Sequence, residues 1–580
     1  TLGPHTFYWF SLAERGVLPD TGRARPIPTI VSTDGWEEVI RGEMRDELAG
    51  VLSDYLHEQH WFRGRAHRIL SAKVVEATPI PYGRKVAFLA LIRVEYAERD
   101  PETYVLPLNL ATGRTAETLK RRNRGAVIAR IAHQAGSRNA EGLLFDAMWD
   151  EDFPAALLKI IASRKGLQGV AGRTTGIPTP ALRQLKVPAK AAAAPRIVEG
   201  DLNNTSVVFG DRLILKLFRC VDDGINPDVE IGAFLSEQHF KHTPPLAGHI
   251  EYRGGRGRQA TIAVLEQYIP HEGDGWDEAQ EAVGAFLRRA ARRTGTPPSV
   301  SLSTATLLDL ASGDPDDAAL DLMGDYLERA RLLGKRTAEL HLALSAGRDD
   351  AAFGPRPFTS YYQRSVYQAM RRLTGQTMFL LRRELDTLDD ALAKHAQTIA
   401  DMEEAVIKRF GAILKTRIEA TRTRYHGDYR LSQVLRDGDD YVFVDFEGEP
   451  DRLMAERQLM HSPLRDVAGM IRSFHASAHV PLSRRRRNGS GAEQTERLEQ
   501  WADYWAQHAS AAFLGEYLRT AGEASFVPRT PRMLYVLLDT LLMERALTDL
   551  QLALVARPEG VRVPLLMLGH LLAEPDPGAK

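Results

Sequence analysis

The chain has 580 residues, of which 44% are hydrophobic and 26% are charged. These values are typical of a globular protein with sizeable cores, and they exclude a chain that is disordered as a whole. The 75 basic and 76 acidic side chains nearly cancel, so no global field favours nucleic acid or an acidic membrane as a partner. At ~150 residues per domain, the length predicts three or four structural units.

Cys220 is the single cysteine, so no disulfide can form within the chain, which fits a reducing cytoplasm. No apolar stretch approaches the ~20 residues needed to cross a bilayer. The N-terminus also lacks the basic and then apolar pattern of a secretion signal. We therefore expect a cytoplasmic protein that binds neither membrane nor nucleic acid. Because the first residue is Thr1 and not Met, we also expect a processed or truncated chain.

The first part of the chain predicts a strand, a linker and a small α+β unit. Residues 6–10 are rich in β-forming side chains and are followed by a Pro- and Gly-rich linker. A helix is predicted to begin near Trp36, where apolar residues recur at helical spacing. The runs 86–92 and 104–108 are typical of strands. Residues 36–125 are therefore predicted to form one unit.

The clearest β-hairpin follows a mixed segment and an alanine-rich connection. Residues 205–209 and 213–218 are apolar runs on either side of a Gly-Asp-Arg turn. Asn226 and Pro227 are predicted to begin a helix, and residues 261–269 are predicted to form another strand.

From Trp276 onward, apolar residues recur almost wholly at helical spacing, with one β-rich interruption at 426–449. A β-rich half followed by a helical half predicts an α+β fold of two lobes with a cleft between them.

The β-rich interruption carries two motifs that fit phosphoryl transfer, which needs carboxylates for magnesium and one for the acceptor's proton. His426, Asp428 and Gln433 match the catalytic-loop pattern H-x-D-x-x-x-x-N, with Gln in place of Asn. Asp445 and Glu447 end a hydrophobic strand as Asp-Phe-Glu, where protein kinases have Asp-Phe-Gly. We predict Asp428 as the catalytic base. The predicted magnesium ligands are Gln433, Asp445 and Glu447. The alternative is a turn and a strand that ends in a solvated acid, which the pairing of both motifs disfavours.

Lys216 lies in the middle of an otherwise apolar strand, where a lysine is costly unless it is paired or reaches solvent. We predict that it binds the ATP phosphates and pairs with Glu230 of the following helix, as in kinases. The alternative is a lysine on the outer face of an amphipathic strand.

Two further segments are candidates for nucleotide binding. The first occupies the position of a phosphate-binding loop, although a turn or capping role is equally compatible: Asn204, Thr205 and Ser206. The second ends a strand just before the helical half and is predicted to bind adenine, unless it is an ordinary strand end: Glu266, Gln267 and Tyr268. By contrast, the four arginines at 484–487 are interpreted as a solvated loop, and the aromatic residues at 501–505 as helix core.

Several motifs together resemble the bacterial maltokinases, which are relatives of the aminoglycoside phosphotransferases. They are H-G-D-Y-x-L-x-Q-V-L at 426–435, V-D-F-E-G-E-P at 444–450, H-S-P-L-R-D-V-A-G-M at 461–470, N-T-S-V-V-F-G-D-R-L-I-L-K-L-F-R at 204–219, N-P-D-V-E-I-G at 226–232 and R-T-A-E-L-H at 336–341.

The resemblance implies a bilobal protein-kinase-like fold and phosphorylation of maltose by Mg-ATP to maltose 1-phosphate, which feeds α-glucan and glycogen synthesis. It also implies an N-terminal cap subdomain at 36–125, an intermediate subdomain at 126–272 that completes the N-lobe, and a mostly helical C-lobe at 273–580. Asp428, Gln433 and Asp445 match the family's catalytic and metal positions.

Residues 1–10 resemble instead the closing strand of the C-terminal β-domain of trehalose synthases, enzymes that are often fused to a maltokinase. We therefore expect residues 1–35 to be a remnant of that domain plus a linker, and a trehalose synthase domain to be a fused or associated partner.

The chain departs from the maltokinase pattern at Arg430 and Ser432 in the catalytic loop, and at Thr548 and Gly560 in the helical half that should shape the acceptor site. Two alternatives therefore stay open. One is a kinase of the same fold for another sugar or an aminoglycoside, and the other is a catalytically silent module that scaffolds trehalose synthase.

Overall fold

The computed structural model describes residues 26–573, except 33–34, 43–44, 134–140, 186–194, 199–202, 294–297, 299, 348–349, 451, 488–491 and 557–559. The strand predicted at 6–10 lies outside the described residues. The chain divides into two compact units, Thr1–Phe153 with Gly169–Ala171, and Pro154–Gln168 with Gly172–Lys580. No helix within the described residues is both long and apolar enough to span a membrane.

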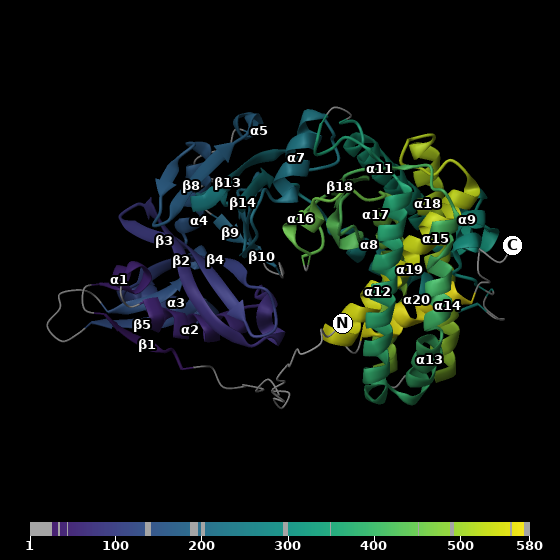
Figure 1. Ribbon diagram of the computed structural model, residues 1–580, viewed down its shortest axis with the longest axis horizontal. Coiled ribbons are helices and arrows are strands. Elements are labelled where there is room, and N and C mark those ends of the chain that lie inside the picture. Colours follow the sequence, from purple (N-terminus) through teal and green to yellow (C-terminus); the bar gives the residue numbers. More distant parts are fainter. Residues whose placement is uncertain are drawn as a thin grey trace, which may run out of the picture. The chain divides into compact units, whose positions relative to one another are not determined.

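The first unit is a mixed sheet with three helices (Figure 1). Its strands pair in the order β1-β5-β6-β4-β3-β2. The pair β1–β5 is parallel and the other pairs are antiparallel. Its elements are β1 (Thr29–Ser32), α1 (Trp36–Arg41), α2 (Arg45–Glu58), β2 (Ile69–Tyr82), β3 (Lys85–Tyr96), β4 (Glu102–Ala111), α3 (Gly113–Arg122), β5 (Val127–His133) and β6 (Gly142–Asp146).

The predicted helix start at Trp36 and the strands predicted at 86–92 and 104–108 are confirmed by α1, β3 and β4. The unit does not end at 125, however, because β5 and β6 extend the same sheet to Asp146. Strand β6 is buried throughout and lies between β4 and β5. Strand β6 pairs with β4 from Leu108 to Ala111, and β5 in turn pairs with β6, so both strands belong to this sheet.

The second unit begins with an antiparallel sheet in the order β7-β8-β13-β14-β11-β10-β9. The predicted hairpin is confirmed by β10 and β11, in which Ser206 pairs with Lys216. Gly210 and Asp211 in its turn both have positive φ, 54° and 52°, the conformation that tight hairpins require. The elements are α4 (Phe153–Ala162), β7 (Gly166–Gln168), β8 (Gly172–Pro178), α5 (Pro180–Gln184), β9 (Pro195–Ile197), β10 (Asn204–Phe209), β11 (Leu213–Phe218), β12 (Cys220–Val221), α7 (Pro227–Glu237), β13 (Leu246–Gly254) and β14 (Gln259–Gln267).

The rest of the second unit is mostly helical, as the periodicity predicts, and only short strands interrupt it. The helices are α8 (Gly275–Ala290), α9 (Thr304–Ser312), α10 (Asp317–Met323), α11 (Tyr326–Leu344), α12 (Ser360–Glu384), α13 (Asp390–Asp401), α14 (Glu403–Phe410), α15 (Ala412–Lys415), α16 (Met454–Arg457), α17 (Leu464–Arg487), α18 (Ala492–Ala521), α19 (Pro531–Ala556) and α20 (Arg562–Leu572). The strands are β15 (Arg356–Pro357), β16 (Thr421–Arg422), β17 (Val434–Asp437) and β18 (Asp440–Phe443).

The long helices pack closely around one apolar core, with α18 between α11 and α17, and α19 against α12 and α17 (Figure 1). Gly334 permits the close approach of α11 to α18, since a Cβ there would lie 2.2 Å from the carbonyl oxygen of Phe513. The aromatic residues at 501–505 are core, as interpreted from the sequence: Trp501, Tyr504 and Trp505 are buried. This helical body carries the β17–β18 hairpin and its flanking loops, which hold the predicted catalytic residues.

Candidate active site

Lys216 of β11 lies at the centre of three carboxylates. Its Nζ is 2.8 Å from Asp228 Oδ2, 2.9 Å from Asp445 Oδ1 and 3.3 Å from Glu447 Oε1. Burial alone would lower the pKa of the lysine, but the three carboxylates outweigh burial and raise the pKa well above its ordinary value. The ammonium is therefore a permanent cation that links the β-sheet to the loop after β18.

The predicted pairing of Lys216 with Glu230 is wrong, because Asp228 takes that position. The side chain of Asn226 caps α7, because its Oδ1 accepts a hydrogen bond from the Asp228 amide at 2.9 Å. Asp228 therefore lies in the first turn of the helix. Successive helix residues are ~100° apart. Glu230 lies two residues after Asp228, so its side chain points in nearly the opposite direction from that of Asp228. Its carboxylate contacts Arg424 at 2.8 Å instead.

Asp228 also fixes the loop that follows β18. Its Oδ1 accepts the backbone amide of Phe446 at 2.7 Å. In this loop Asp445 has φ of 70°, a conformation that is uncommon for a residue other than glycine and is often found at functional sites. Burial would raise the pKa of Asp445, but Lys216 lowers it to about 2, so the carboxylate is ionised.

The predicted metal ligands lie together with this carboxylate. Gln433 Nε2 donates to Asp445 Oδ2 at 2.9 Å, and Asn204 Nδ2 donates to Glu447 Oε1 at 2.7 Å. Carboxylate oxygens of Asp228, Asp445 and Glu447 lie within 4.8 Å of one another. Hard oxygen donors of this kind fit Mg²⁺, and Asp228 is a member of the set that sequence reasoning missed.

Asp428 lies in the loop between β16 and the 3₁₀ turn Leu431–Gln433. Its carboxylate is 12% exposed and lies 3.2 Å from the guanidinium of Arg430. Burial raises the pKa of Asp428 above its ordinary value, although Arg430 and Arg545 act in the opposite direction. A buried carboxylate of raised pKa is a suitable proton acceptor for a hydroxyl group.

Asp466, at the start of α17, holds the catalytic loop in place. Its Oδ2 accepts the His426 amide at 2.7 Å and its Oδ1 accepts the Gly427 amide at 3.1 Å. His341 Nε2 lies 3.0 Å from the same carboxylate. Asp466 and His341 both lie in motifs shared with the maltokinases, R-D-V and E-L-H, but neither was predicted to have a role. Their position in these motifs was the sequence signal that could have identified them.

His426 connects the catalytic loop to the loop after β18 that carries Asp445. Its Nε2 lies 3.0 Å from the carbonyl oxygen of Val444, directly before Asp445. Gly427 has φ of 92°, and a Cβ there would lie 3.1 Å from Gly448. Glycine at 427 therefore permits both the turn and the close approach of the two loops.

The predicted phosphate-loop residues do not form a loop. Asn204, Thr205 and Ser206 are buried in β10. Besides the contact of Asn204 with Glu447, Thr205 Oγ1 accepts from Arg219 Nε at 2.8 Å. These three residues pair with Phe218, Leu217 and Lys216 of β11, which is why they extend the strand.

The predicted adenine-binding segment ends β14. The Gln267 amide donates to the carbonyl oxygen of Pro245 at 3.0 Å, and the Tyr268 amide donates to that of Arg212 at 2.9 Å. Both N–H groups therefore already have hydrogen-bond acceptors in the protein. The Glu266 carboxyl is buried, and burial together with the charge of Asp228 raises its pKa. Adenine binding by the remaining groups of this segment stays a prediction.

A polar pocket lies beside Gly427 and Tyr429 of the catalytic loop. Its free volume is about 30 Å³. Arginines and carboxylates pair in its lining: Arg545 contacts Glu449 at 2.8 Å and Arg465 contacts Glu544 at 2.6 Å. One departure from the maltokinase pattern, Thr548, lies in this lining.

The chain is similar to known families of kinases. Residues 55–150 match the family of the maltokinase N-terminal cap domain. The chain is 25% identical to a glucosamine kinase of Mycolicibacterium smegmatis over 66% of this chain and 81% of that protein. It is 26% identical to a glucosamine kinase of Streptacidiphilus jiangxiensis over 64% of this chain and 72% of that protein.

Solved structures of glucosamine kinase share the fold. A complex with glucosamine, ADP and inorganic phosphate has a TM-score of 0.55 at 18% identity, covering 85% of this chain and 94% of that one. A second crystal form has a TM-score of 0.53 at 17% identity, with 90% and 99% covered. The α+β fold with a cap and a helical C-terminal part is therefore that of these kinases.

Proposed function

We propose that this chain, a maltokinase-like kinase by its cap domain and its fold, transfers the γ-phosphoryl group of ATP to a hydroxyl group of a sugar. The observation that carries the proposal is the contact of Lys216 with Asp228 and Asp445, next to a buried Asp428. A lysine for phosphate, carboxylates for magnesium and a carboxylate for the acceptor proton are the parts that phosphoryl transfer requires.

Each residue has a distinct role in this proposal. Lys216 moves from Asp445 and Glu447 to bind phosphate oxygens of ATP, while its contact with Asp228 keeps it oriented. Mg²⁺ held by Asp445, Glu447 and the amide oxygen of Gln433 would neutralise phosphate charge. Asp428 accepts the proton of the attacking hydroxyl group, so the oxygen–phosphorus bond forms while ADP departs. Most of the rate enhancement then comes from positioning and charge stabilisation.

Maltose is the acceptor that we favour, phosphorylated at its anomeric hydroxyl to give maltose 1-phosphate and ADP, a precursor for α-glucan synthesis. The match to the maltokinase cap domain supports this choice. The charge of the polar pocket supports it too. Three arginines and three carboxylates line the pocket, and Glu449 and Glu544 are already paired with arginines, so the pocket suits neutral hydroxyl groups.

Glucosamine is the second candidate, favoured by the two glucosamine kinases that the chain resembles. In either case the pocket has to widen, since about 30 Å³ holds one water. Arg452, which contacts Glu449, has 36% of its side chain exposed, against 16% for Arg465 and 19% for Arg545, so it is the arginine of this lining that moves most readily. The expected partnership with a trehalose synthase domain stays a prediction, because it rests on residues 1–10.

The deciding experiment measures ADP release by the full chain with Mg-ATP and maltose, glucose, glucosamine, trehalose or kanamycin, with Asp428→Asn as the inactive control. Turnover with maltose alone supports the first choice. Turnover with glucosamine replaces the acceptor and keeps the mechanism. Silence with every acceptor would overturn the kinase proposal in favour of a scaffold.

A further inference from the structure

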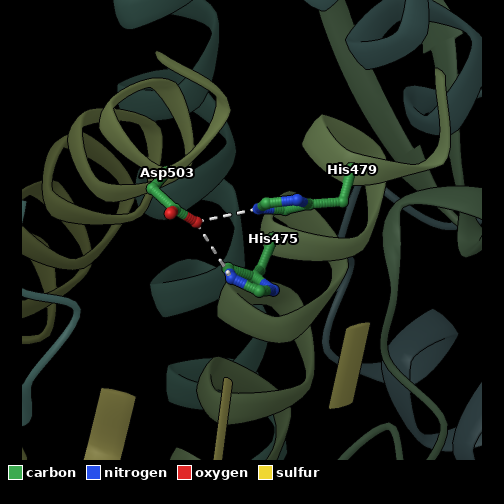
Figure 2. Close-up of side chains that lie close together, drawn as sticks. All are labelled: His475, His479 and Asp503. Atoms are coloured by element: carbon green, nitrogen blue, oxygen red, sulfur yellow. Dashed lines mark hydrogen bonds and ion pairs between the residues drawn. The ribbon is translucent and has the colours of Figure 1, made fainter. Parts of the chain in front are cut away.

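Two histidines of α17 and one aspartate of α18 converge away from the kinase site. Figure 2 shows His475 and His479 on one helix, both facing Asp503 on the other. The two histidines are four residues apart, so they lie on the same face of α17, one turn after the other. His475 is nine residues beyond Asp466 in the same helix, which is roughly 14 Å along its axis. The cluster is thus separate from the catalytic loop.

The spacing of the three ligand atoms fits a metal ion. His479 Nε2 is 2.8 Å and His475 Nε2 is 3.6 Å from the same atom, Asp503 Oδ1. Two ligands at zinc bond lengths and a tetrahedral angle are ~3.3 Å apart, a value between these two distances. One donor atom from each of the three residues lies within 4.8 Å of the others, so small side-chain rotations suffice for a shared ion.

The cluster is buried, and the imidazole of His475 lacks a hydrogen-bond partner within the described residues. The side chains of His475 and His479 are 5% and 4% exposed. Within the described part of the chain, neither ring nitrogen of His475 has a hydrogen-bond partner, since 3.6 Å is too long for one. A buried imidazole without hydrogen-bond partners is unfavourable. A metal bond to Nε2 would satisfy that nitrogen.

A fourth ligand is within reach. His570 of α20 has its Nε2 at 3.8 Å from Asp503 Oδ2. An ion bound here would link α17, α18 and α20, which are three helices of the helical body. Imidazoles with one carboxylate select zinc-class ions, whereas Mg²⁺ prefers oxygen donors alone.

We propose that His475, His479 and Asp503 bind one divalent transition-metal ion of the zinc class, with His570 or water as the fourth ligand, and that this ion stabilises the helical body. The ion takes no part in phosphoryl transfer. The competing arrangement is a metal-free network in which Asp503 accepts from His479 and a water serves His475; a cavity of about 30 Å³ borders His475.

The test uses the full chain without a histidine tag, so that no tag binds metal. Metal content is measured by elemental mass spectrometry after gel filtration, and zinc or cobalt is titrated into the chelator-treated chain by calorimetry and visible absorption. We expect about one equivalent of zinc and, with cobalt, the ligand-field bands of a four-coordinate site. Chelation should lower the melting temperature, and zinc should restore it.

Two variants and one control locate the ion. His475→Gln with His479→Gln, and separately Asp503→Asn, should lose both metal and the chelator effect. His508→Gln is the matched control. It removes another buried histidine of α18, whose Nε2 lies 3.7 Å from Asp316, and should keep both. A wild-type chain that retains no metal and binds no added zinc would overturn the proposal even if the variants failed to fold. Binding that survives in Asp503→Asn and the double variant would overturn it equally.

Discussion

Asp228 joins Lys216 to the loop that carries Asp445: one carboxylate oxygen lies 2.8 Å from the lysine Nζ, and the other accepts the Phe446 amide at 2.7 Å. A single fully buried side chain at the start of α7 therefore positions both the cation that we propose for phosphate binding and the loop that we propose for metal binding. This double role explains why an aspartate two residues before Glu230 is the more important acid of α7.

Asp228→Asn is expected to lower kcat/KM for ATP by about 10- to 100-fold. The variant keeps an acceptor for the Phe446 amide but loses the charge that orients Lys216. A hydrogen bond to a charged group contributes ~1.5–3 kcal/mol, which corresponds to this range. Steady-state kinetics with varied ATP measures the effect.

Glu230→Gln is the control for that experiment. It removes the charge that pairs with the buried Arg424, so it should lower the melting temperature and leave the ATP kinetics near wild type. Equal kinetic losses in the two variants would mean that Glu230 serves Lys216 after all.

Asp428→Asn is expected to lower kcat by on the order of 10²–10⁴, the usual contribution of general base catalysis. The KM for ATP should change little, because the proposed mechanism assigns Asp428 to the acceptor and Lys216 to the phosphates. Asp437→Asn, at an exposed position of β17, serves as the matched control. A variant with Asn at 428 that retained full kcat would exclude Asp428 as the base.

Arg430→Gln should shift the acidic limb of the kcat/KM profile to higher pH. Asp428 accepts a proton only as a carboxylate, so activity falls as the pH drops through its pKa. Burial already raises that pKa, and Arg430 at 3.2 Å lowers it. Removing the guanidinium therefore raises the pKa further. A limb that moves to lower pH, or not at all, would place the titrating group elsewhere.

The catalytic loop could be predicted from sequence because short-range geometry fixes it. Asp428 and Gln433 flank one 3₁₀ turn, and a two-strand hairpin brings Asp445 back to Gln433. The partner of Lys216 could not be predicted, since it depends on the rotation of α7 about its own axis, which tertiary packing sets.

Other features left no distinctive sequence signal. Asp466 acts through backbone amides, and an aspartate that accepts two amides looks in sequence like any acid at a helix start. Residues 134–141 separate β5 from β6, and β6 joins the cap sheet through long-range pairing with β4, while β5 pairs with β6. The likeness to maltokinases indicated a cap, but periodicity could not give its end.

Asp445→Asn should raise the Mg²⁺ concentration needed for half-maximal activity by roughly tenfold or more, the scale on which changed metal ligation weakens sites. The variant loses an ionised ligand whose pKa Lys216 holds at about 2. This dependence is measured by titrating magnesium at a fixed ATP concentration, with activity plotted against the magnesium that is not bound to ATP. An unchanged magnesium requirement would exclude Asp445 as a ligand.

Asp539→Ala is expected to destabilise the helical body by about 3–5 kcal/mol, the usual cost of breaking one side of a buried ion pair. Asp539 of α19 accepts from Arg409 Nε at 2.9 Å and from its terminal nitrogen at 2.6 Å, and each side chain is 4% exposed. Asp321→Ala removes an exposed partner of Arg293 and should cost less than about 1 kcal/mol. Urea unfolding followed by far-ultraviolet circular dichroism reports on this unit, because most of the chain's helix lies there. Equal losses in the two variants would contradict the argument from burial, since only the first leaves a guanidinium without its carboxylate in the apolar core.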